Sequence, residues 1–303
     1  MKLVVTGGAG FIGSHIAEEL LRQGNDVVVL DNLASGSAGN VPKKARFAKK
    51  DIVRDDITKE LEGTDAVFHF AADPDVRLSA DNSVATFDNN VLGTFRVLEA
   101  CRKAGVERFV LASTSAVYGE ASVIPTPETH PCVPISNYGA SKLACEAYAG
   151  SYAHSYGIKS TVMRYANVFG PGSTHGVIFD FYQKLRNDSK RLEILGNGKQ
   201  EKSYLYVSDC VSATMAAFSS QKSVFEAYNA GSREKRSVDE IARFVSRSMG
   251  VKPEVAYTGG ERGWAGDVRL MMLECSKIEC TGWSAKIGFD HGAGLYLDWL
   301  RNR

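Results

Sequence analysis

The sequence predicts an α/β fold in which a doubly wound parallel sheet is joined to a smaller α/β domain. Three observations predict it. Short apolar runs alternate with amphipathic stretches of helical length, a glycine-rich turn follows the first run directly, and the regular pattern loosens after residues 170–172. The apolar runs also lack polar alternation, as strands do when helices cover both faces of their sheet. With 303 residues, 44% of them hydrophobic, the chain can bury such a core.

The individual elements follow from these patterns in order along the chain. We expect strands over residues 3–6, 27–30, 66–70, 109–112 and 160–165, and helices over residues 11–23, 89–104 and from about Asn137. In the first helix Ile12, Ile16 and Leu20 repeat every four residues and form one buried stripe. We predict that residues 1–166 and about 205–232 form the sheet domain, and that about 167–204 and 233–303 form the smaller one.

The charge and composition exclude several classes of function. Lys and Arg number 36 against 35 Asp and Glu, so no global field attracts the chain to nucleic acid or to an anionic membrane. No apolar run approaches the roughly 20 residues of a membrane span, and glycines follow the start too early for a signal peptide. The six cysteines include no CxxC pair, which favours reduced, packed thiols over a disulfide framework or a zinc site. We therefore predict a cytoplasmic protein without a metal, a nucleic-acid partner or a membrane partner.

A glycine-rich turn after the first strand predicts a dinucleotide site. Gly7, Gly10 and Gly13 are spaced three apart and lead into the first helix. Glycine lets backbone amides approach a pyrophosphate, and the helix N-terminus adds partial positive charge. The spacing alone is close to chance, but Asp31 ends the second strand about 20 residues further on, where a carboxylate accepts ribose hydroxyls and repels a 2′-phosphate. This Rossmann-type context predicts NAD rather than NADP, against the alternative of a structural turn and a surface aspartate.

Tyr138 and Lys142 form the candidate catalytic pair. They lie four residues apart on one face of the predicted helix, although this spacing too is close to chance by itself. Its weight rises because Thr114 follows the strand over 109–112, at the carboxyl edge where open α/β sheets bind ligands. A free tyrosine, with a pKa near 10, is a weak base at neutral pH, but an adjacent ammonium and a positively charged nicotinamide both favour the phenolate. We therefore expect Tyr138 to accept a hydroxyl proton; the alternative is an exposed helical tyrosine.

Motifs spread over nearly the whole chain resemble the UDP-glucose 4-epimerase family of the extended short-chain dehydrogenase/reductase superfamily. They are the segments 6–14, 31–33, 69–72, 89–91, 117–119, 138–142 and 164–170, with Asp267 and Trp283 near the end. The resemblance implies an enzyme that interconverts UDP-glucose and UDP-galactose through a transient 4-keto sugar. It also implies that the sheet domain binds NAD and that the smaller domain binds the nucleotide sugar.

The same resemblance implies roles for individual residues. Tyr138 acts as acid and base, Lys142 tunes it and binds the nicotinamide ribose, and Thr114 hydrogen-bonds the reacting hydroxyl. The implied NAD contacts are Gly7, Gly10, Phe11, Ile12, Gly13, Asp31, Asn32, Ser35, Gly36, Asp51, Ile52, Phe70, Ala71, Ala72, Asn89, Ser113, Tyr138, Lys142, Tyr165 and Val168. The implied UDP-sugar contacts are Thr114, Tyr138, Asn167, Val177, Tyr204 and Arg262. A homodimer is implied through a helical bundle, in which Phe95, Leu98 and Cys101 serve either the interface or the core.

Two departures from the family pattern bear on the ligand contacts. Lys202 stands where many relatives carry arginine, which keeps the charge but loses the bidentate fork for phosphate. Residues 73–75, Asp-Pro-Asp, stand where some relatives place a lysine.

Several alternative functions stay open. A nucleotide-sugar 4,6-dehydratase begins with the same oxidation, but Ser115 and Ala116 occupy the positions of the acid pair that follows the threonine in that group. A non-catalytic nucleotide-binding protein would keep the fold, although such proteins often lose the tyrosine or the lysine. Among epimerases, UDP-N-acetylhexosamines and UDP-uronic acids follow UDP-glucose as substrates. Met271 lies where relatives vary in side-chain size, but a flexible methionine decides little.

Overall fold

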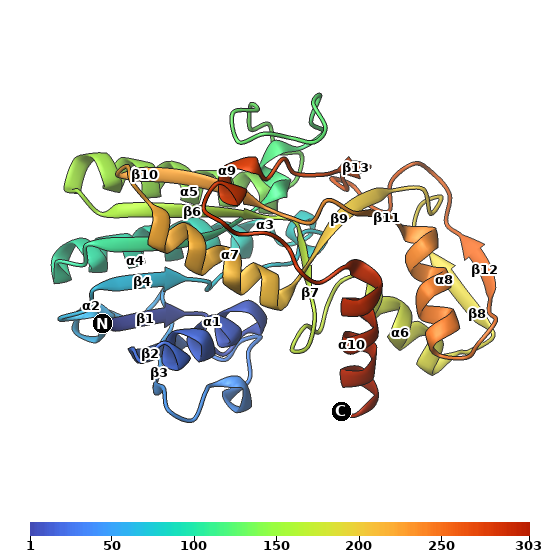
Figure 1. The fold of residues 1–303 in the computed structure, drawn as a ribbon, viewed down its shortest axis with the longest axis horizontal. Coiled ribbons are helices and arrows are strands. Elements are labelled where there is room, and N and C mark those ends of the chain that lie inside the picture. The colour runs from blue at the N-terminus through green and yellow to red at the C-terminus, as the bar shows by residue number, and fades with distance from the viewer.

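The computed structural model describes residues 1–303, apart from the side chain of Leu78. Two lobes lie side by side: a larger one built on a long sheet, and a smaller one that carries the C-terminus (Figure 1). The chain crosses between them several times, so each lobe combines segments that are far apart in the sequence.

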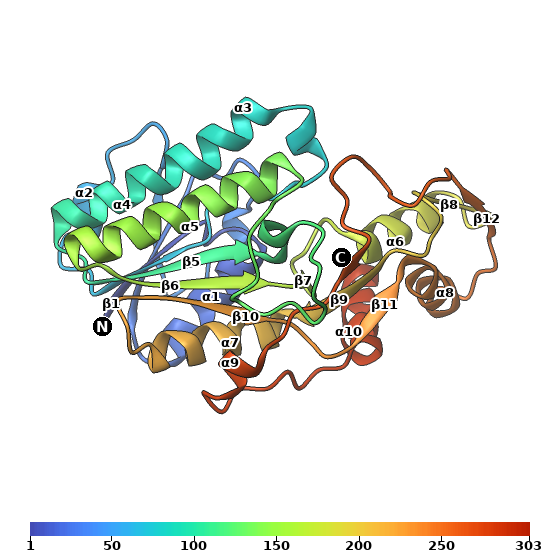
Figure 2. The same ribbon diagram turned by 90° about the horizontal axis from the view of Figure 1, so that it is seen from above.

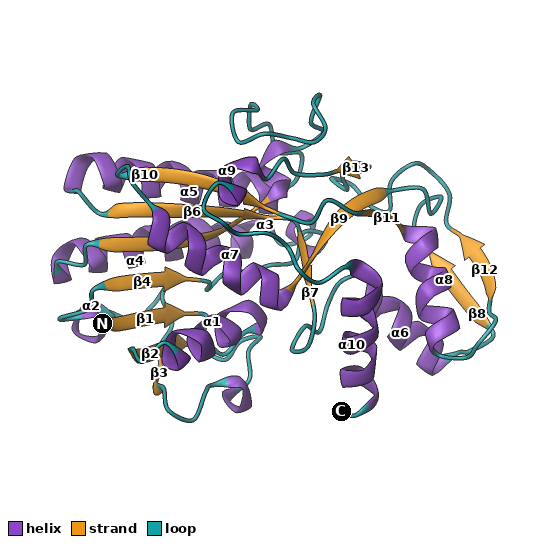
Figure 3. Cartoon of the chain, viewed as in Figure 1, coloured by secondary structure: helices purple, strands orange, loops and turns teal.

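Seven parallel strands form the sheet of the larger lobe, in the order β10-β6-β5-β4-β1-β2-β3 (Figure 3). Their bounds are β1 Lys2–Thr6, β2 Asp26–Asp31, β3 Arg46–Lys49, β4 Ala66–His69, β5 Arg108–Thr114, β6 Lys159–Tyr165 and β10 Phe225–Ala230. Because β1 connects to β2 on one side and pairs with β4 on the other, the strand order reverses at β1. Open α/β sheets bind ligands at such a point, in the crevice outside the carboxyl ends of the strands.

Both faces of this sheet are apolar because alternate side chains of each strand enter different cores. Val5 and Val29 pack with α1 (Phe11–Arg22) and α7 (Val207–Ser220) on one face. Val4 and Val28 pack with α4 (Gly93–Ala104), α5 (Asn137–Tyr156) and the short α2 (Thr58–Leu61) on the other. Figure 2 shows α4 and α5 lying together on one side of the strands and α1 and α7 on the opposite side. The doubly wound α/β fold that the sequence predicts is confirmed.

The predicted elements differ from the observed ones at a few positions. The expected helix over 89–104 divides into a π-helical segment, η3 (Phe87–Leu92), and α4, which ends at Gly105 in the left-handed conformation with φ 72°. The strand β3 was not predicted, because only Ala48 of its residues is even partly buried at this edge of the sheet. The helix α5 begins where expected, and the side chain of its N-cap Ser136 accepts a hydrogen bond from the backbone N–H of Gly139 at 3.0 Å.

The smaller lobe combines a four-stranded sheet, a two-stranded sheet and three longer helices. The strands β7 Asn167–Phe169, β9 Glu201–Tyr206, β11 Lys235–Ser237 and β13 Leu270–Met271 form the first sheet, and β8 Arg191–Ile194 pairs with β12 Glu254–Tyr257. The helices α6 Val177–Asn187, α8 Val238–Ser248 and α10 Phe289–Arg301 enclose a separate core that includes Phe169, Tyr204 and Phe289. The remaining short elements are η1 Ala38–Asn40, η2 Leu78–Ala80, α3 Ser83–Thr86, η4 Ser115–Tyr118 and α9 Ser276–Glu279.

The segment around α9 returns to the larger lobe. Leu273, Cys275, Ile278 and Trp283 are buried in the core between the sheet, α1 and α7, although they fall within the residues that we predicted for the smaller domain. The two-domain division therefore stays a prediction, with this segment as the place where packing and the predicted boundaries differ. All six cysteines are free thiols, and four of them are buried. No helix among the described residues is long and apolar enough to cross a membrane.

Candidate active site

The glycine-rich turn between β1 and α1 lies at the carboxyl edge of the sheet and has no room for side chains. A Cβ added to Gly7, whose φ is +69°, would lie 2.5 Å from the backbone nitrogen of Ala71, and one added to Gly13 would lie 2.2 Å from the carbonyl oxygen of Gly7. Gly10 is the N-cap of α1, and its N–H donates to the same carbonyl at 3.0 Å. The turn thus holds bare backbone against the N-terminus of α1, an arrangement that fits the pyrophosphate of a dinucleotide.

Asp31 ends β2 and holds this turn in place. Its carboxylate accepts hydrogen bonds from the N–H groups of Ala9 at 3.0 Å and Leu33 at 2.8 Å, and only 8% of the residue is exposed. Leu33 itself adopts a left-handed φ of 63°. Each carboxylate oxygen has further lone-pair capacity, so Asp31 can still accept two ribose hydroxyls. A second negative group, such as a 2′-phosphate, would be repelled there.

Further predicted NAD contacts surround the ends of β2 and β3. Asn32 lies with its amide nitrogen 3.4 Å from the carboxylate of Asp51. Ile52 packs so closely on Gly93 of α4 that a Cβ there would lie 2.8 Å from its Cδ1. Ser35 is exposed, and Gly36 lies against the carbonyl of Ala9, 2.7 Å from the position that a Cβ would take.

The other predicted NAD contacts lie around the glycine turn and the small lobe. Phe11 and Ile12 begin α1, and the Phe11 ring lies 3.3 Å from the position that a Cβ of Gly172 would take. Phe70, Ala71 and Ala72 follow β4, and the Phe70 N–H donates to the Thr6 carbonyl at 3.0 Å. Val168 lies in β7, partly buried against the core of the larger lobe.

Three of the predicted NAD contacts have side chains that the structure places differently. The Tyr165 ring is buried between β6 and α7, where its hydroxyl lies 2.7 Å from that of Thr214, so only its backbone can face a cofactor. The Ser113 hydroxyl donates to Glu146 rather than into the crevice. Asn89 is exposed, whereas its neighbour Asn90 is buried. The Asn90 side chain joins the backbone of Asp73 to the hydroxyl of Ser141, with donor–acceptor distances of 2.7 to 3.1 Å.

Thr114 and Tyr138 meet at the carboxyl edge of β5. Thr114 is the last residue of the strand, and Tyr138 lies in the first turn of α5, which packs along β5 and β6. Burial raises the pKa of Tyr138 to about 12, a hydrogen bond with Thr114 opposes this rise, and the nearby Asp73 adds to it. The tyrosine is therefore a neutral phenol in the protein alone.

Lys142 lies one turn further along α5 and is 3% exposed. Burial lowers the pKa of its ammonium, while Cys145 and Glu146 on the same helix raise it. Lys142 is not among the groups that shift the pKa of Tyr138 in the protein alone. Our expectation that this ammonium, together with a nicotinamide charge, favours the phenolate stays a prediction. Removal of the phenol from water outweighs its hydrogen bond with Thr114, so a positive charge brought by a ligand would favour the phenolate.

A row of buried polar side chains runs beneath this pair. The His69 ring, at the end of β4, lies 2.6 Å from the hydroxyl of Thr6 and 2.9 Å from that of Thr94, which in turn donates to the Cys145 sulfur. Burial first, and then the charge of Lys142, lower the pKa of His69 to about 3. The ring is therefore neutral at physiological pH and adds no charge to the site.

The predicted nucleotide-sugar contacts gather where the two lobes meet. Asn167 on β7 is in register with Tyr204 on β9, and its amide donates to the backbone carbonyl of Ser203 at 3.3 Å. Tyr204 is buried among aromatic side chains of the smaller lobe, and burial followed by the charge of Asp267 raises its pKa. Val177 begins α6 and is half-buried at the edge of the same core.

Two cations of this region are held by carboxylates that sequence reasoning did not assign. Lys202 forms an ion pair with the buried Asp267, and Arg262 pairs with Glu120 at 2.7 Å while donating to the Asp267 backbone carbonyl at 2.6 Å. Asp267 is separated from Lys202 by 65 residues, so no spacing in the sequence marks the pair. Among the described side chains, no group of three His, Cys, Asp or Glu residues is placed to hold a metal ion.

Comparison with known proteins is consistent with this arrangement. Residues 3–231 match the model of the NAD dependent epimerase/dehydratase family. A "Putative UDP-glucose 4-epimerase" of Methanocaldococcus jannaschii is 36% identical over 307 residues, covering 99% of this chain and 98% of that protein. A solved UDP-galactose 4-epimerase superposes with a TM-score of 0.91 at 42% identity, covering 100% of this chain and 99% of the other. The UDP-glucuronic acid 4-epimerase from Bacillus cereus, solved with UDP-glucuronic acid and NAD, superposes with a TM-score of 0.92 at 29% identity, with the same coverage.

Proposed function

The chain belongs to the NAD dependent epimerase/dehydratase family, and from that premise we propose that it interconverts UDP-glucose and UDP-galactose by epimerisation at C4. One observation carries the proposal. Tyr138 and Thr114 are hydrogen-bonded at the carboxyl edge of the sheet, beside a glycine turn that fits a dinucleotide and beneath a smaller lobe that gathers Asn167, Tyr204 and Arg262. This arrangement supports an acid/base role for Tyr138 between the cofactor site and the candidate nucleotide site.

The cofactor of this family is NAD, and the residues of this chain fit it. Gly7 and Gly13 keep the pyrophosphate position free of side chains, and Asp31 lies where the adenosine ribose is expected. NAD supplies a hydride acceptor that can return the same hydride. Because epimerisation involves no net oxidation, we expect the dinucleotide to remain bound through the cycle.

The chain's own residues then handle the proton and the orientation of the sugar. Tyr138 accepts the proton of the C4 hydroxyl as the hydride leaves C4, and Thr114 holds that hydroxyl in reach. The 4-keto sugar turns over in the pocket, and the proton and hydride return to C4 on its opposite face. Lys142 binds the nicotinamide ribose. Because burial raises the pKa of Tyr138 to about 12 in the protein alone, the positive charge of a bound oxidised cofactor would favour the phenolate.

The segment after Thr114 separates this reaction from dehydration. Loss of water across C5 and C6 requires an additional acid and base, but Ser115 and Ala116 occupy the start of η4 and neither carries a carboxyl. The backbone N–H of Ala116 instead donates to the Thr114 hydroxyl at 3.1 Å. This supports a reaction in which the sugar loses no water, as in epimerisation.

The charge near Tyr138 supports a neutral hexose over a uronic acid. Asp73 lies close enough to raise the pKa of Tyr138, at the place where some relatives carry a lysine. A carboxylate there disfavours a second carboxylate on the sugar. Met271, at the position where relatives vary, pairs in β13 with Lys202 of β9 and is 8% exposed, so it adds little to this choice.

A panel of UDP-sugars tests the proposed substrate. UDP-glucose, UDP-N-acetylglucosamine and UDP-glucuronic acid, each incubated with the purified protein without added cofactor, should give the C4 epimer fastest with UDP-glucose. We expect kcat/KM for UDP-glucose to exceed the others by about tenfold or more. A faster reaction of UDP-glucuronic acid would contradict the substrate, and absence of any epimer from all three would contradict the proposed activity.

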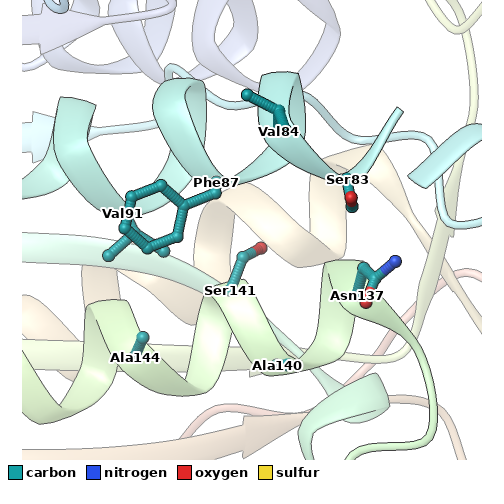
Figure 4. Close-up of a pocket in the computed structure, with 8 residues that line it drawn as sticks. All are labelled: Ser83, Val84, Phe87, Val91, Asn137, Ala140, Ser141 and Ala144. Carbon is teal, nitrogen blue, oxygen red and sulfur yellow. The ribbon is translucent and has the colours of Figure 1, made fainter. Parts of the chain in front are cut away.

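We further propose that a second copy of the chain covers the apolar groove between η3 and α5. Figure 4 shows Phe87, Val91 and Ala144 lining this groove, which has a volume of about 430 Å³, and Val84 and Phe87 are 70% and 57% exposed. Leu98 and Cys101 are fully buried in the core and cannot serve the interface. Phe95, half-buried against the Tyr148 ring, remains available to it. Sedimentation of the purified chain would test the homodimer.

A further inference from the structure

A buried carboxylate, Glu146, lies behind the candidate catalytic residues. It is located on α5 one turn beyond Lys142 and is 4% exposed. Its carboxylate accepts a hydrogen bond from the Ser113 hydroxyl at 2.5 Å. Both carboxylate oxygens also accept hydrogen bonds from Arg164, with Nε–Oε1 at 3.0 Å and Nη2–Oε2 at 2.6 Å. Bidentate pairing of this kind fixes both the distance and the orientation of the two side chains.

The partners of Glu146 form a row across three neighbouring strands. Ser113 of β5 is in register with Arg164 of β6, which is in register with Asn229 of β10. The row is completed by Tyr118 of η4, whose hydroxyl accepts from Arg164 Nη1 and donates to the Asn229 side chain, both at 2.8 Å. The Ser113–Arg164 pair of this row lies one residue before the Thr114–Tyr165 pair, which ends the two strands. The Glu146 carboxylate on α5 thus binds β5 and β6 directly, and it is linked to β10 through Arg164 and Tyr118.

Stability alone does not account for such a group. Burying two charges costs several kcal/mol of desolvation per ion, and well-packed apolar side chains often replace a buried ion pair without loss of stability. What the pair does supply is a fixed geometry. It fixes the position of α5 along β5 and β6 and its rotation about the helix axis, and these determine the distance and orientation of Tyr138 relative to Thr114.

We propose that Glu146 is the positioning residue of the catalytic helix: through Ser113 and Arg164 it sets the approach of Tyr138 to Thr114. The inference rests on the proposed function, in which Tyr138, Thr114 and Lys142 carry out the chemistry. It adds a residue that touches neither sugar nor cofactor.

The charges around Lys142 mean that the pH dependence of kcat can test this proposal. Glu146 and Cys145 of α5 raise its pKa against the larger effect of burial, and the neutral His69 of β4 faces it from the sheet. Tyr138 lies on the same helix as Lys142. Removing the Glu146 charge leaves Arg164 unpaired nearby, and both changes favour loss of the Lys142 proton. The high-pH limb of the kcat profile should therefore move to lower pH.

Glu146→Gln tests the proposal, with Glu279→Gln on α9 as the matched control, because Glu279 pairs with Arg233 through both carboxylate oxygens at a partly exposed site. We expect Glu146→Gln to lower kcat by on the order of 10- to 100-fold with KM for UDP-glucose little changed, and to move the high-pH limb down by roughly one unit. Glu279→Gln should match the wild type in both kcat and the position of the high-pH limb. A Glu146→Gln variant with wild-type kcat and an unshifted profile would overturn the proposal.

A second variant keeps the test valid if Glu146→Gln does not fold. The double substitution Glu146→Leu with Arg164→Met removes both charges together and leaves no orphaned ion. It should fold, retain bound NAD and show the same loss of kcat; a wild-type kcat would contradict the proposal. If the wild type itself epimerises no UDP-sugar, the proposed function fails, and a crystal structure of the double variant then decides separately. A displaced α5 would support the positioning role, and an α5 superposable on the wild type would refute it.

Discussion

Replacing Tyr138 with phenylalanine is expected to reduce turnover of UDP-glucose by on the order of 10³-fold while leaving the protein folded and its NAD bound. The substitution removes only the hydroxyl that accepts the C4 proton and that hydrogen-bonds with Thr114. Since no other group is predicted to take that proton, the chemical step should fail and the binding steps should survive. Rates of epimer formation, together with the dinucleotide released on denaturation, measure the two separately.

Tyr148→Phe provides the matched control for this substitution. Tyr148 lies on the same helix, is 40% exposed and packs edge-on against Phe95, away from the site. Its variant should turn over at the wild-type rate. Should Tyr138→Phe keep more than a tenth of the wild-type kcat, Tyr138 would not be the acid/base of this reaction.

Replacing Gly13 with alanine is expected to abolish co-purifying NAD and, with it, activity. Gly13 lies within α1 at an ordinary helical φ, so alanine is acceptable to the backbone and the clash alone decides the result. The added Cβ would lie 2.2 Å from the Gly7 carbonyl oxygen and 3.0 Å from the Gly8 Cα, both backbone atoms of the turn. The turn must move, which should also lower the free energy of unfolding by about 1–3 kcal/mol.

Gly294→Ala is the opposite case in the same chain. It lies within α10, and a Cβ there meets no atom within 4 Å. Alanine should therefore raise the free energy of unfolding by up to about 1 kcal/mol and leave the NAD content unchanged. Urea unfolding and the amount of bound dinucleotide, measured on both variants, give the comparison. Stoichiometric NAD in Gly13→Ala would contradict the assignment of the turn as the pyrophosphate site.

The parts of the fold that could be predicted are those set by local patterns. The strands β1, β2, β4 and β5 carry apolar side chains on both faces because helices cover both, so their positions are readable as hydrophobic runs. The edge strand β3 has little buried surface and left no such pattern. The π-helical turn of η3 was also missed, because its hydrophobic periodicity differs little from that of a regular helix.

The site could be predicted as a set of residues but not as an electrostatic environment. Motifs locate Tyr138, Lys142 and Thr114, yet the pKa of Tyr138 depends on how deeply the fold buries it, and no motif in the sequence gives that depth. The pairs Glu146–Arg164 and Lys202–Asp267 were not foreseen because 18 and 65 residues separate their members. Only the parallel register of the strands and the meeting of the lobes bring them together.

The central claim is that one hydride leaves C4 and returns to C4 on the other face. UDP-glucose carrying deuterium at C4 tests it most directly when it is incubated with the purified protein in ordinary water and the product is analysed by mass spectrometry and NMR. We predict UDP-galactose that retains the deuterium at C4 and has the mass of the labelled substrate. Loss of the deuterium to solvent, or a product lighter by one water, would contradict the claim.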